Sequence, residues 1–374
     1  MKNINENFLT DAFRDKDIIL ALAKKIQQEA QDLKEKLYVM EVCGGHTHTL
    51  MKYGLTSLLP PSIQCVHGPG CPVCIMPKNR INQAYEIAML PDTILLTLGD
   101  MLKVPGSNGS LQNARSKGAQ IGFLYSPFQA LEVAKKNPSK KVVYFAIGFE
   151  TTTPMTAALL QRTINEGITN LYFHINHVLV PPPLYAILDS KDNKINALLA
   201  PSHVSVISGS KIYEPIFEKY QIPIVVSGFE PVDMMQSLLM IVKQAKNKTP
   251  KLEVEYSRVV TRDGNKKAQE LTNTFMQTRE NFSWRGLGNI PHSALTLKKE
   301  FEKYDAEIIF NSYLSKEDIK DNRACRCGDI LKGVAKPYDC KVFGKSCTPS
   351  NPLGSCMVSS EGACAAYYKY GALR

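Results

Sequence analysis

Apolar positions along the chain follow two different spacings. Between Asp17 and Leu37 they recur every three or four residues, which predicts an amphipathic helix. Further along, short and almost continuous apolar runs are typical of strands buried on both faces, and we expect them at residues 38–42, 93–98, 120–125, 142–147, 171–173, 204–207 and 223–226. Helix-length segments separate several of these runs, at residues 78–90, 154–165 and 232–246. The alternation predicts an α/β fold with parallel sheets covered on both faces.

One short sequence device occurs twice. A predicted strand ends in Gly-Phe-Glu and a predicted helix follows, at residues 148–150 and again at residues 228–230. A common strand-to-helix turn would produce the same pattern, but we interpret it as two related parallel-sheet α/β domains that face a cleft. The expected boundaries are residues 1–160 for domain I, with the N-terminal helix, and residues 161–285 for domain II.

The character of the chain changes after Trp284. A linker rich in glycine and proline leads to an expected helix at residues 294–304, and a cysteine-, glycine- and proline-rich tail follows. Such a tail has few apolar runs, so it needs a cross-link such as a bound metal or disulfides to stabilise its fold. Residues 286–374 are therefore expected to form a third, C-terminal domain.

Composition narrows the class of protein. The 374 residues include ten cysteines and carry a formal net charge of +10. Residues 1–16 are polar, so no signal peptide is expected, and no unbroken apolar run is long enough for a membrane span. In a cytoplasmic protein, reduced cysteines serve metal or redox chemistry more often than structural bridges. The basic charge alone fits nucleic acid, but no nucleic-acid-binding motif or interleaving of aromatic and basic residues supports that interpretation.

Six of the cysteines lie in the last 50 residues, with the spacing C-x-C-x12-C-x6-C-x8-C-x7-C. No histidine follows His292, so a metal site there would use sulfur ligands alone. The spacing matches neither zinc-ribbon pairs nor the bacterial ferredoxin run. Six thiols leave two beyond the four that a [4Fe–4S] cluster or zinc needs, so we favour a cluster flanked by a redox pair over a structural zinc site.

Two more cysteine motifs lie in the first part of the chain. Cys71 and Cys74 form a C-x-x-C motif after a Gly-Pro-Gly turn, and such dithiols exchange readily with disulfides; half of a metal site is the alternative. Cys43 and His46 follow the predicted strand at 38–42 directly, where open α/β sheets bind ligands. The intervening glycines leave Cys43 and His46 accessible, so the pair can bind a transition metal with open positions. A buried free cysteine beside a tight turn is the structural alternative.

Other polar residues near strand ends carry weaker signals. Glu150 begins a predicted helix, where it either caps the helix or faces the cleft near the Cys43 motif. His174, His177 and His203 lie beside strands and are better explained as core or loop histidines than as ligands.

Taken together, these motifs resemble the HypD family of hydrogenase maturation factors. The resemblance is carried by residues 43–48, 68–74, 148–152, 201–205 and 228–233 and by the C-terminal cysteine pattern through Cys364. Each motif is weak alone, but the six occur in order over residues 41–364 and are specific together.

The resemblance implies a role in building the iron centre of [NiFe] hydrogenases, an iron ion that carries two cyanides and one carbon monoxide. It implies a cytoplasmic assembly scaffold with redox activity. This scaffold would work with the chaperone HypC, receive cyanide from HypE together with HypF, serve the hydrogenase large subunit indirectly, and draw on an electron donor that the resemblance does not identify. Neither a membrane nor nucleic acid is expected as a partner.

The resemblance also implies roles for particular residues. Cys43 would hold the transient iron together with a HypC cysteine, with His46 as an auxiliary group. Cys71 and Cys74 would pass electrons or form a disulfide beside the iron. By similarity to ferredoxin–thioredoxin reductase, the [4Fe–4S] cluster would be bound by Cys325, Cys340, Cys347 and Cys364, and the redox pair would be Cys327 and Cys356. The competing hypothesis is an iron–sulfur thiol–disulfide oxidoreductase, which should survive replacement of Cys43.

The proposed cluster also offers an explanation for the positive charge of the C-terminal residues. Residues 320–374 contain nine lysines and arginines against four aspartates and glutamates. An all-thiolate cluster is anionic, so we expect this local positive charge to help hold the cluster and tune its potential.

Overall fold

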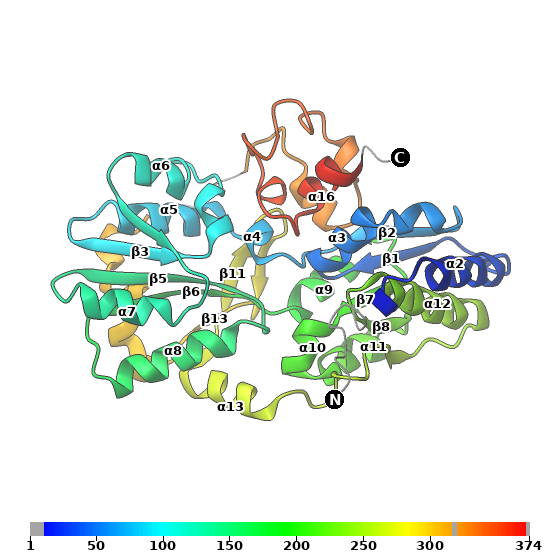
Figure 1. The fold of residues 1–374 in the computed structure, drawn as a ribbon, viewed down its shortest axis with the longest axis horizontal. Coiled ribbons are helices and arrows are strands. Elements are labelled where there is room, and N and C mark those ends of the chain that lie inside the picture. Colours follow the sequence, from blue (N-terminus) through cyan, green and yellow to red (C-terminus); the bar gives the residue numbers. More distant parts are fainter. Residues whose placement is uncertain (1–10, 316–318, 320, 372–374) are drawn as a thin grey trace, which may run out of the picture.

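Two parallel β-sheets organise the computed structural model, which describes residues 11–315, 319 and 321–371 (Figure 1). Sheet A has the strand order β2-β1-β7-β8-β9 and consists of β1 (Leu37–Glu41), β2 (Ile63–His67), β7 (Ala197–Pro201), β8 (Ile224–Ser227) and β9 (Leu252–Val254). Sheet B has the order β4-β3-β5-β6 and consists of β3 (Thr93–Thr97), β4 (Gln120–Phe123), β5 (Lys141–Gly148) and β6 (Leu171–His177). The predicted α/β class with parallel sheets is confirmed.

Helices cover both faces of each sheet, as strands that are apolar on both sides require. On sheet A, α2 (Lys16–Ala30) and α12 (Pro231–Asn247) pack together over one face, and α9 (Pro181–Leu188), α10 (Ser202–Ser208) and α11 (Glu214–Tyr220) belong to the other side. On sheet B, α7 (Gln129–Lys136), α8 (Thr153–Asn165) and α13 (Lys266–Phe275) cover one face, and α5 (Lys78–Ala88) and α6 (Leu111–Ser116) the other.

The remaining elements link and cap the two sheets. Two antiparallel pairs follow α13: β10 (Met276–Thr278) with β13 (Leu295–Leu297), and β11 (Asn281–Trp284) with β12 (Gly288–Pro291). The short helix α4 (Pro72–Ile75) lies between the two sheets (Figure 1), and α3 (Gly44–Lys52) follows β1 and packs against α16. Helices α14 (Ala306–Ile309), α15 (Cys327–Leu331) and α16 (Ala363–Tyr370) belong to the C-terminal part. Figure 1 shows the cysteine-rich segment (orange to red) above α3 and α4. Among the residues described, no helix has the length and apolar character needed to cross a membrane.

Most predicted strands are confirmed within a residue or two, but three sequence interpretations are wrong. Residues 204–207 lie in α10 rather than in a strand, because the strand is the preceding buried run, β7, and the chain turns at Pro201. The expected helix at 294–304 is β13 followed by a 3₁₀ helix, Lys299–Tyr304. The first helix ends at Ala30 and not at Leu37, since Leu37 begins β1; strand β2 was not predicted at all.

The two sheets draw on both parts of the chain. Strands β1 and β2 precede residue 160 and β7 to β9 follow it, yet all five belong to sheet A. In sheet B, β5 and β6 are hydrogen-bonded neighbours on opposite sides of the expected boundary. The division at residue 160 therefore does not separate the sheets. The two copies of the repeated Gly-Phe-Glu pattern lie on different sheets. The first joins β5 to α8 on sheet B, and the second joins β8 to α12 on sheet A.

Candidate functional site

The two sheets turn their topological switch points toward one cleft. In sheet A the chain order reverses between β1 and β7, and in sheet B it reverses between β3 and β5. Ligands of open α/β sheets bind beyond the carboxyl ends of strands at such points. A cavity of about 490 Å³ lies there; it is lined by Cys43 and His203, which follow β1 and β7, and by Asp100, Thr151 and Thr152, which follow β3 and β5. The fold therefore marks this cleft as the candidate site.

Cys43 stands at the start of α3, where two close backbone approaches surround it. A Cβ at Gly70 would lie 2.3 Å from the Cα of Cys43, so only glycine lets the turn before Cys71 reach this point. A Cβ at Gly44 would lie 2.3 Å from the carbonyl oxygen of Glu361, which comes from the C-terminal segment. These glycines therefore bring three distant segments together at one thiol.

Gly70→Ala tests this approach. The added methyl group would meet backbone atoms that cannot rotate away, so we expect the free energy of unfolding to fall by about 1–3 kcal/mol, as for other overpacked sites. Chemical denaturation measures the change. Gly99→Ala is the matched control, because a Cβ at Gly99 meets nothing within 4 Å, and it should change stability by less than about 0.5 kcal/mol. Equal effects of the two substitutions would contradict the close approach.

Acidic groups surround the Cys43 thiol. The side chain is half-buried, and desolvation followed by the charge of Glu361 raises the pKa of Cys43 to about 12. Desolvation and the charge of Asp100 in turn raise the pKa of Glu361. The thiolate needed for a soft metal ligand is therefore disfavoured until a cation arrives. Sequence reasoning missed Asp100 and Glu361 as lining residues, and only their position after a strand (Asp100) and beside the C-terminal cysteines (Glu361) signalled them.

His46 is not accessible, contrary to the expectation from the glycine pair. Its ring is fully buried and stacks on Phe229, with ring centroids 4.5 Å apart. The Nε2 atom lies 3.1 Å from the carbonyl oxygen of Gly228 and 3.3 Å from that of Ser227, so Nε2 carries the hydrogen and donates it. Burial lowers the pKa of His46 to about 4, which keeps the ring neutral. His46 thus ties α3 to the β8–α12 turn behind Cys43.

Glu150 points away from the cleft that its neighbours line. Its Oε1 atom accepts a hydrogen bond of 2.9 Å from the backbone N–H of Val180, and the residue lines a separate cavity of about 420 Å³ beside α10 and α13. The expected alternative in which Glu150 faces Cys43 is not what the structure describes. Burial raises the pKa of Glu150 from 4.5 to about 7.

The raised pKa of Glu150 predicts a pH-dependent contribution to stability. The unfolded chain loses this proton near its ordinary pKa and the folded protein keeps it to about pH 7, so stability falls as pH rises through this window. Glu150→Gln keeps an acceptor for Val180 and removes the titration. Relative to wild type, the variant should gain up to about 3 kcal/mol between pH 5 and pH 8. Urea unfolding at both pH values measures this, with Glu132→Gln at an exposed position as control. A gain that is the same at both pH values would contradict the prediction.

The predicted redox cysteines form a continuous line of thiols. The backbone N–H of Cys74 donates to Cys71 Sγ at 3.3 Å, and the Cys74 thiol hydrogen-bonds Cys356. Cys356 in turn hydrogen-bonds Cys327, whose sulfur lies 3.3 Å from that of Cys325. At the other end, the Cys71 charge acts on Cys43 in the cleft. Cysteines that are almost 300 residues apart in sequence are thus brought together, and all ten cysteines are free thiols.

One thiol in this line differs from its neighbours. Hydrogen bonds from Cys327 and Cys74 lower the pKa of Cys356 to about 6, although burial opposes this. Burial and its bond to Cys356 raise the pKa of Cys74 well above the ordinary value. Cys356 is therefore the thiolate of the group, and a thiolate is the attacking species in thiol–disulfide exchange.

Several of the C-terminal thiols lie close to one another. Cys364 hydrogen-bonds Cys327, Cys347 feels the charges of Cys325 and Cys327, and Cys340 Sγ lies 3.7 Å from the carbonyl oxygen of Ala324. Thiols without a competing imidazole are the ligand type that a thiolate-bound cluster requires. Cys325 and Cys327 are in direct contact, and in residues 11–315, 319 and 321–371 no three or more histidine, cysteine, aspartate or glutamate side chains are grouped around a single metal position.

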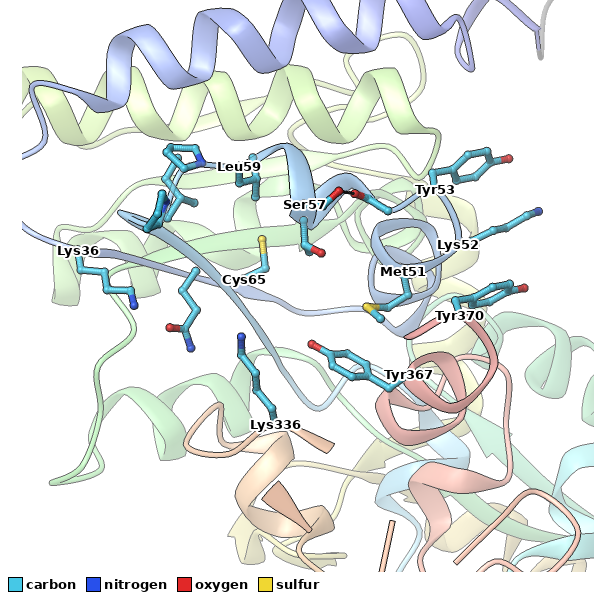
Figure 2. A pocket seen from close by; sticks show the side chains of 16 residues that line it. Lys36, Met51, Lys52, Tyr53, Ser57, Leu59, Cys65, Lys336, Tyr367 and Tyr370 are labelled. Carbon is cyan, nitrogen blue, oxygen red and sulfur yellow. Dashed lines mark hydrogen bonds between the residues drawn. The ribbon is translucent and has the colours of Figure 1, made fainter. Parts of the chain in front are cut away.

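Another cavity, of about 840 Å³, lies apart from the cleft, against α3 and α16. Figure 2 shows Cys65 within it, with Lys336 and Tyr367 of the C-terminal part on one side and Ser57 on the other. Burial, followed by the charge of Glu41, raises the pKa of Cys65 above its ordinary range. Cys65 is half-buried and belongs neither to the thiol line nor to the C-terminal set, so it provides a natural control for cysteine substitutions.

Fold and site together define a class: an α/β protein with two parallel sheets whose shared cleft is connected by thiols to a cysteine-rich C-terminal part. Comparison with known proteins gives the family. The profile described as "HypD: Hydrogenase formation hypA family" matches residues 17–371. The chain is 48% identical over 371 residues to hydrogenase maturation factor HypD2 of Bradyrhizobium diazoefficiens, with 97% of each chain covered. It is 42% identical over 364 residues to hydrogenase maturation factor HypD of Escherichia coli, with 96% of this chain and 97% of that protein covered. The chain belongs to the HypD family of hydrogenase maturation factors.

Proposed function

We propose that this hydrogenase maturation factor acts in the cytoplasm as the scaffold on which the Fe(CN)₂CO group is assembled, and that it supplies electrons to that assembly. The observation that carries the proposal is the series of neighbouring thiols that runs from the cysteine-rich C-terminal part to Cys71, next to the close approach of Gly70 to Cys43 in the cleft. A scaffold alone would need Cys43 but not the line of thiols that leads to it.

In this proposal the iron is cargo, held by the Cys43 thiolate together with a cysteine of the chaperone HypC, and HypE with HypF delivers the cyanide. A soft thiolate is a suitable ligand for low-valent iron that carries strong-field ligands. Asp100 and Glu361 place negative charge around the thiol, which favours arrival of a cation. His46, held neutral and buried, keeps α3 and hence Cys43 in place rather than binding the iron. Transfer to the hydrogenase large subunit then follows through the chaperone.

We further propose that Cys325, Cys340, Cys347 and Cys364 hold a [4Fe–4S] cluster, which leaves Cys327 and Cys356 as a redox pair. When bound, the cluster supplies single electrons from an external donor. Support comes from the interactions of Cys327 with Cys325, Cys364 and Cys356. The redox pair would thus lie between the cluster and Cys74.

The exchange step can be written from these contacts. With Cys71 and Cys74 oxidised and Cys327 and Cys356 reduced, the Cys356 thiolate attacks Cys74, and the Cys71 thiolate leaves beside Cys43. Cys327 then attacks Cys356 and breaks the Cys356–Cys74 bond, and its proton passes to the departing Cys74 thiolate, whose pKa is raised. Two electrons move to the Cys71–Cys74 pair, and Cys327–Cys356 becomes the disulfide that the cluster must reduce.

Infrared spectroscopy of the protein purified without oxygen together with its HypC partner tests the proposal. Bands of metal-bound cyanide and carbon monoxide are expected, and their absence from a cell that makes active [NiFe] hydrogenase would contradict the scaffold role. The second candidate function is a thiol–disulfide oxidoreductase, favoured by the contact between Cys74 and Cys356. That function requires no iron at Cys43, so Cys43→Ala separates the two.

A further inference from the structure

A buried arginine lies beside the proposed cluster ligands without a full set of partners. Arg285 follows β11 and is 4% exposed. Its Nε atom donates to Asp321 Oδ1 at 2.8 Å, and Nη1 donates to the carbonyl oxygen of Pro105 at 3.3 Å. The Nη2 atom is buried and has no hydrogen-bond partner. A buried cationic group with unused donors is costly unless an anion compensates it.

The neighbouring groups show where such an anion belongs. Arg285 and Cys325 lie close enough for their charges to interact, and the backbone N–H of Arg285 donates to the carbonyl oxygen of Ile75 at 2.7 Å, beside the Cys71–Cys74 motif. The backbone also holds Arg285 close to this segment, because a Cβ at Gly286 would lie 2.4 Å from the Cα of Gly328, next to Cys327. Lys78 adds a second positive charge, and its pKa is lowered by burial and then by Arg285.

Arg326 offers a contrast on the same segment. It is adjacent to Cys325 in sequence, but its side chain is 42% exposed and pairs with Asp329 at 2.9 Å. Charges at exposed positions are screened by water and salt, whereas buried charges act at low effective dielectric. The charge expected to act most strongly on the C-terminal thiols is therefore that of the buried Arg285, which is distant in sequence, and not that of the exposed Arg326.

We propose that Arg285 is a positioning residue that directs a buried positive charge and a free N–H donor at the sulfur atoms of the cluster, and thereby raises the cluster's reduction potential. This inference rests on the proposed cluster. The reduced cluster carries one more negative charge than the oxidised one, so a nearby cation stabilises the reduced form more. Asp321 attenuates the effect because it partly neutralises the guanidinium.

The experiment is a redox titration of the cluster in the full chain, followed by electron paramagnetic resonance, with iron content and thermal unfolding measured alongside. Arg285→Met should lower the midpoint potential, with about a tenfold change in the reduction equilibrium, or about 59 mV for one electron. Arg285→Lys should keep most of the wild-type potential because it retains the charge. Arg326→Met is the matched control and should leave the potential unchanged.

Asp321→Asn keeps the arginine and removes its counter-charge, so it should raise the potential. Opposite shifts in Arg285→Met and Asp321→Asn are not expected of a merely structural arginine. The Asp321 variant carries the test if Arg285→Met does not fold. The inference is overturned if the cluster is intact but neither substitution moves its potential, or if Arg326→Met shifts it as much as Arg285→Met does. A wild-type protein without a four-iron cluster would overturn the proposed cofactor instead.

Discussion

Cys43→Ala is expected to abolish the infrared bands of metal-bound cyanide and carbon monoxide in the protein purified with its HypC partner. The physical reason is that Cys43 is the one cysteine lining the cleft at the switch points, and no other thiol among the described lining residues replaces it. His46 does not substitute either, because its Nε2 hydrogen is used by backbone carbonyls and its ring is buried. Hydrogenase activity of cells that carry only this variant should be lost in parallel.

Cys65→Ala is the matched control for this experiment. Cys65 is also half-buried, but it lies within strand β2 of sheet A and lines the separate cavity shown in Figure 2. The control should retain the bands. The scaffold role is contradicted if Cys43→Ala retains both bands at wild-type intensity, and the oxidoreductase then becomes the better interpretation.

The second large effect concerns the thiol line. In the Cys71→Ser, Cys327→Ser double variant, Cys74 and Cys356 remain in contact but lack the partners that resolve a mixed disulfide. Mild oxidation with diamide should therefore join Cys74 to Cys356 as the main new disulfide. Peptide mass spectrometry without reduction identifies the pair. The rate should rise with pH only to about pH 6 and then level off, because the pKa of Cys356 is lowered to about 6.

A third substitution provides the control for the trapping experiment. Adding Cys356→Ser to the double variant removes the attacking thiolate, so Cys74 should remain a free thiol under the same treatment. The proposed order of exchange fails if Cys74 of the double variant pairs instead with Cys43 or with a cysteine other than Cys356. A rate that keeps rising toward pH 9 would show that Cys356 is not the thiolate.

Local pattern was sufficient for much of the fold. The α/β class, strands β1, β3, β5 and β8 and helices α5, α8 and α12 follow from periodicity, because each buries side chains at the spacing that its own geometry imposes. The hydrophobic pattern gave a wrong prediction where a short apolar run fits either a strand or a helix. Residues 204–207 are apolar enough for a strand, but the buried strand is the preceding run, β7, and residues 204–207 belong to the helix α10 that follows it.

Other features depend on contacts between distant segments. The exchange of strands between the two halves of the chain puts β1 beside β7 and β5 beside β6, and no local preference encodes which strand pairs with which. The residues that line the cleft likewise could not be predicted from local sequence. Asp100 and Glu361 are ordinary acidic residues in sequence, and Glu150, which the motif placed in the cleft, points elsewhere.

The residue order alone predicts the kind of chemistry: sulfur ligands without histidine in the tail, a dithiol at Cys71 and Cys74, and a metal-binding Cys43 after a strand. These features are local, since residue type and short spacing define them. The tertiary structure decided which thiols lie together, which of them has a lowered pKa, and which arginine is buried close to the C-terminal segment. Burial and through-space charge set these properties, and both come from segments that lie hundreds of residues apart in the chain.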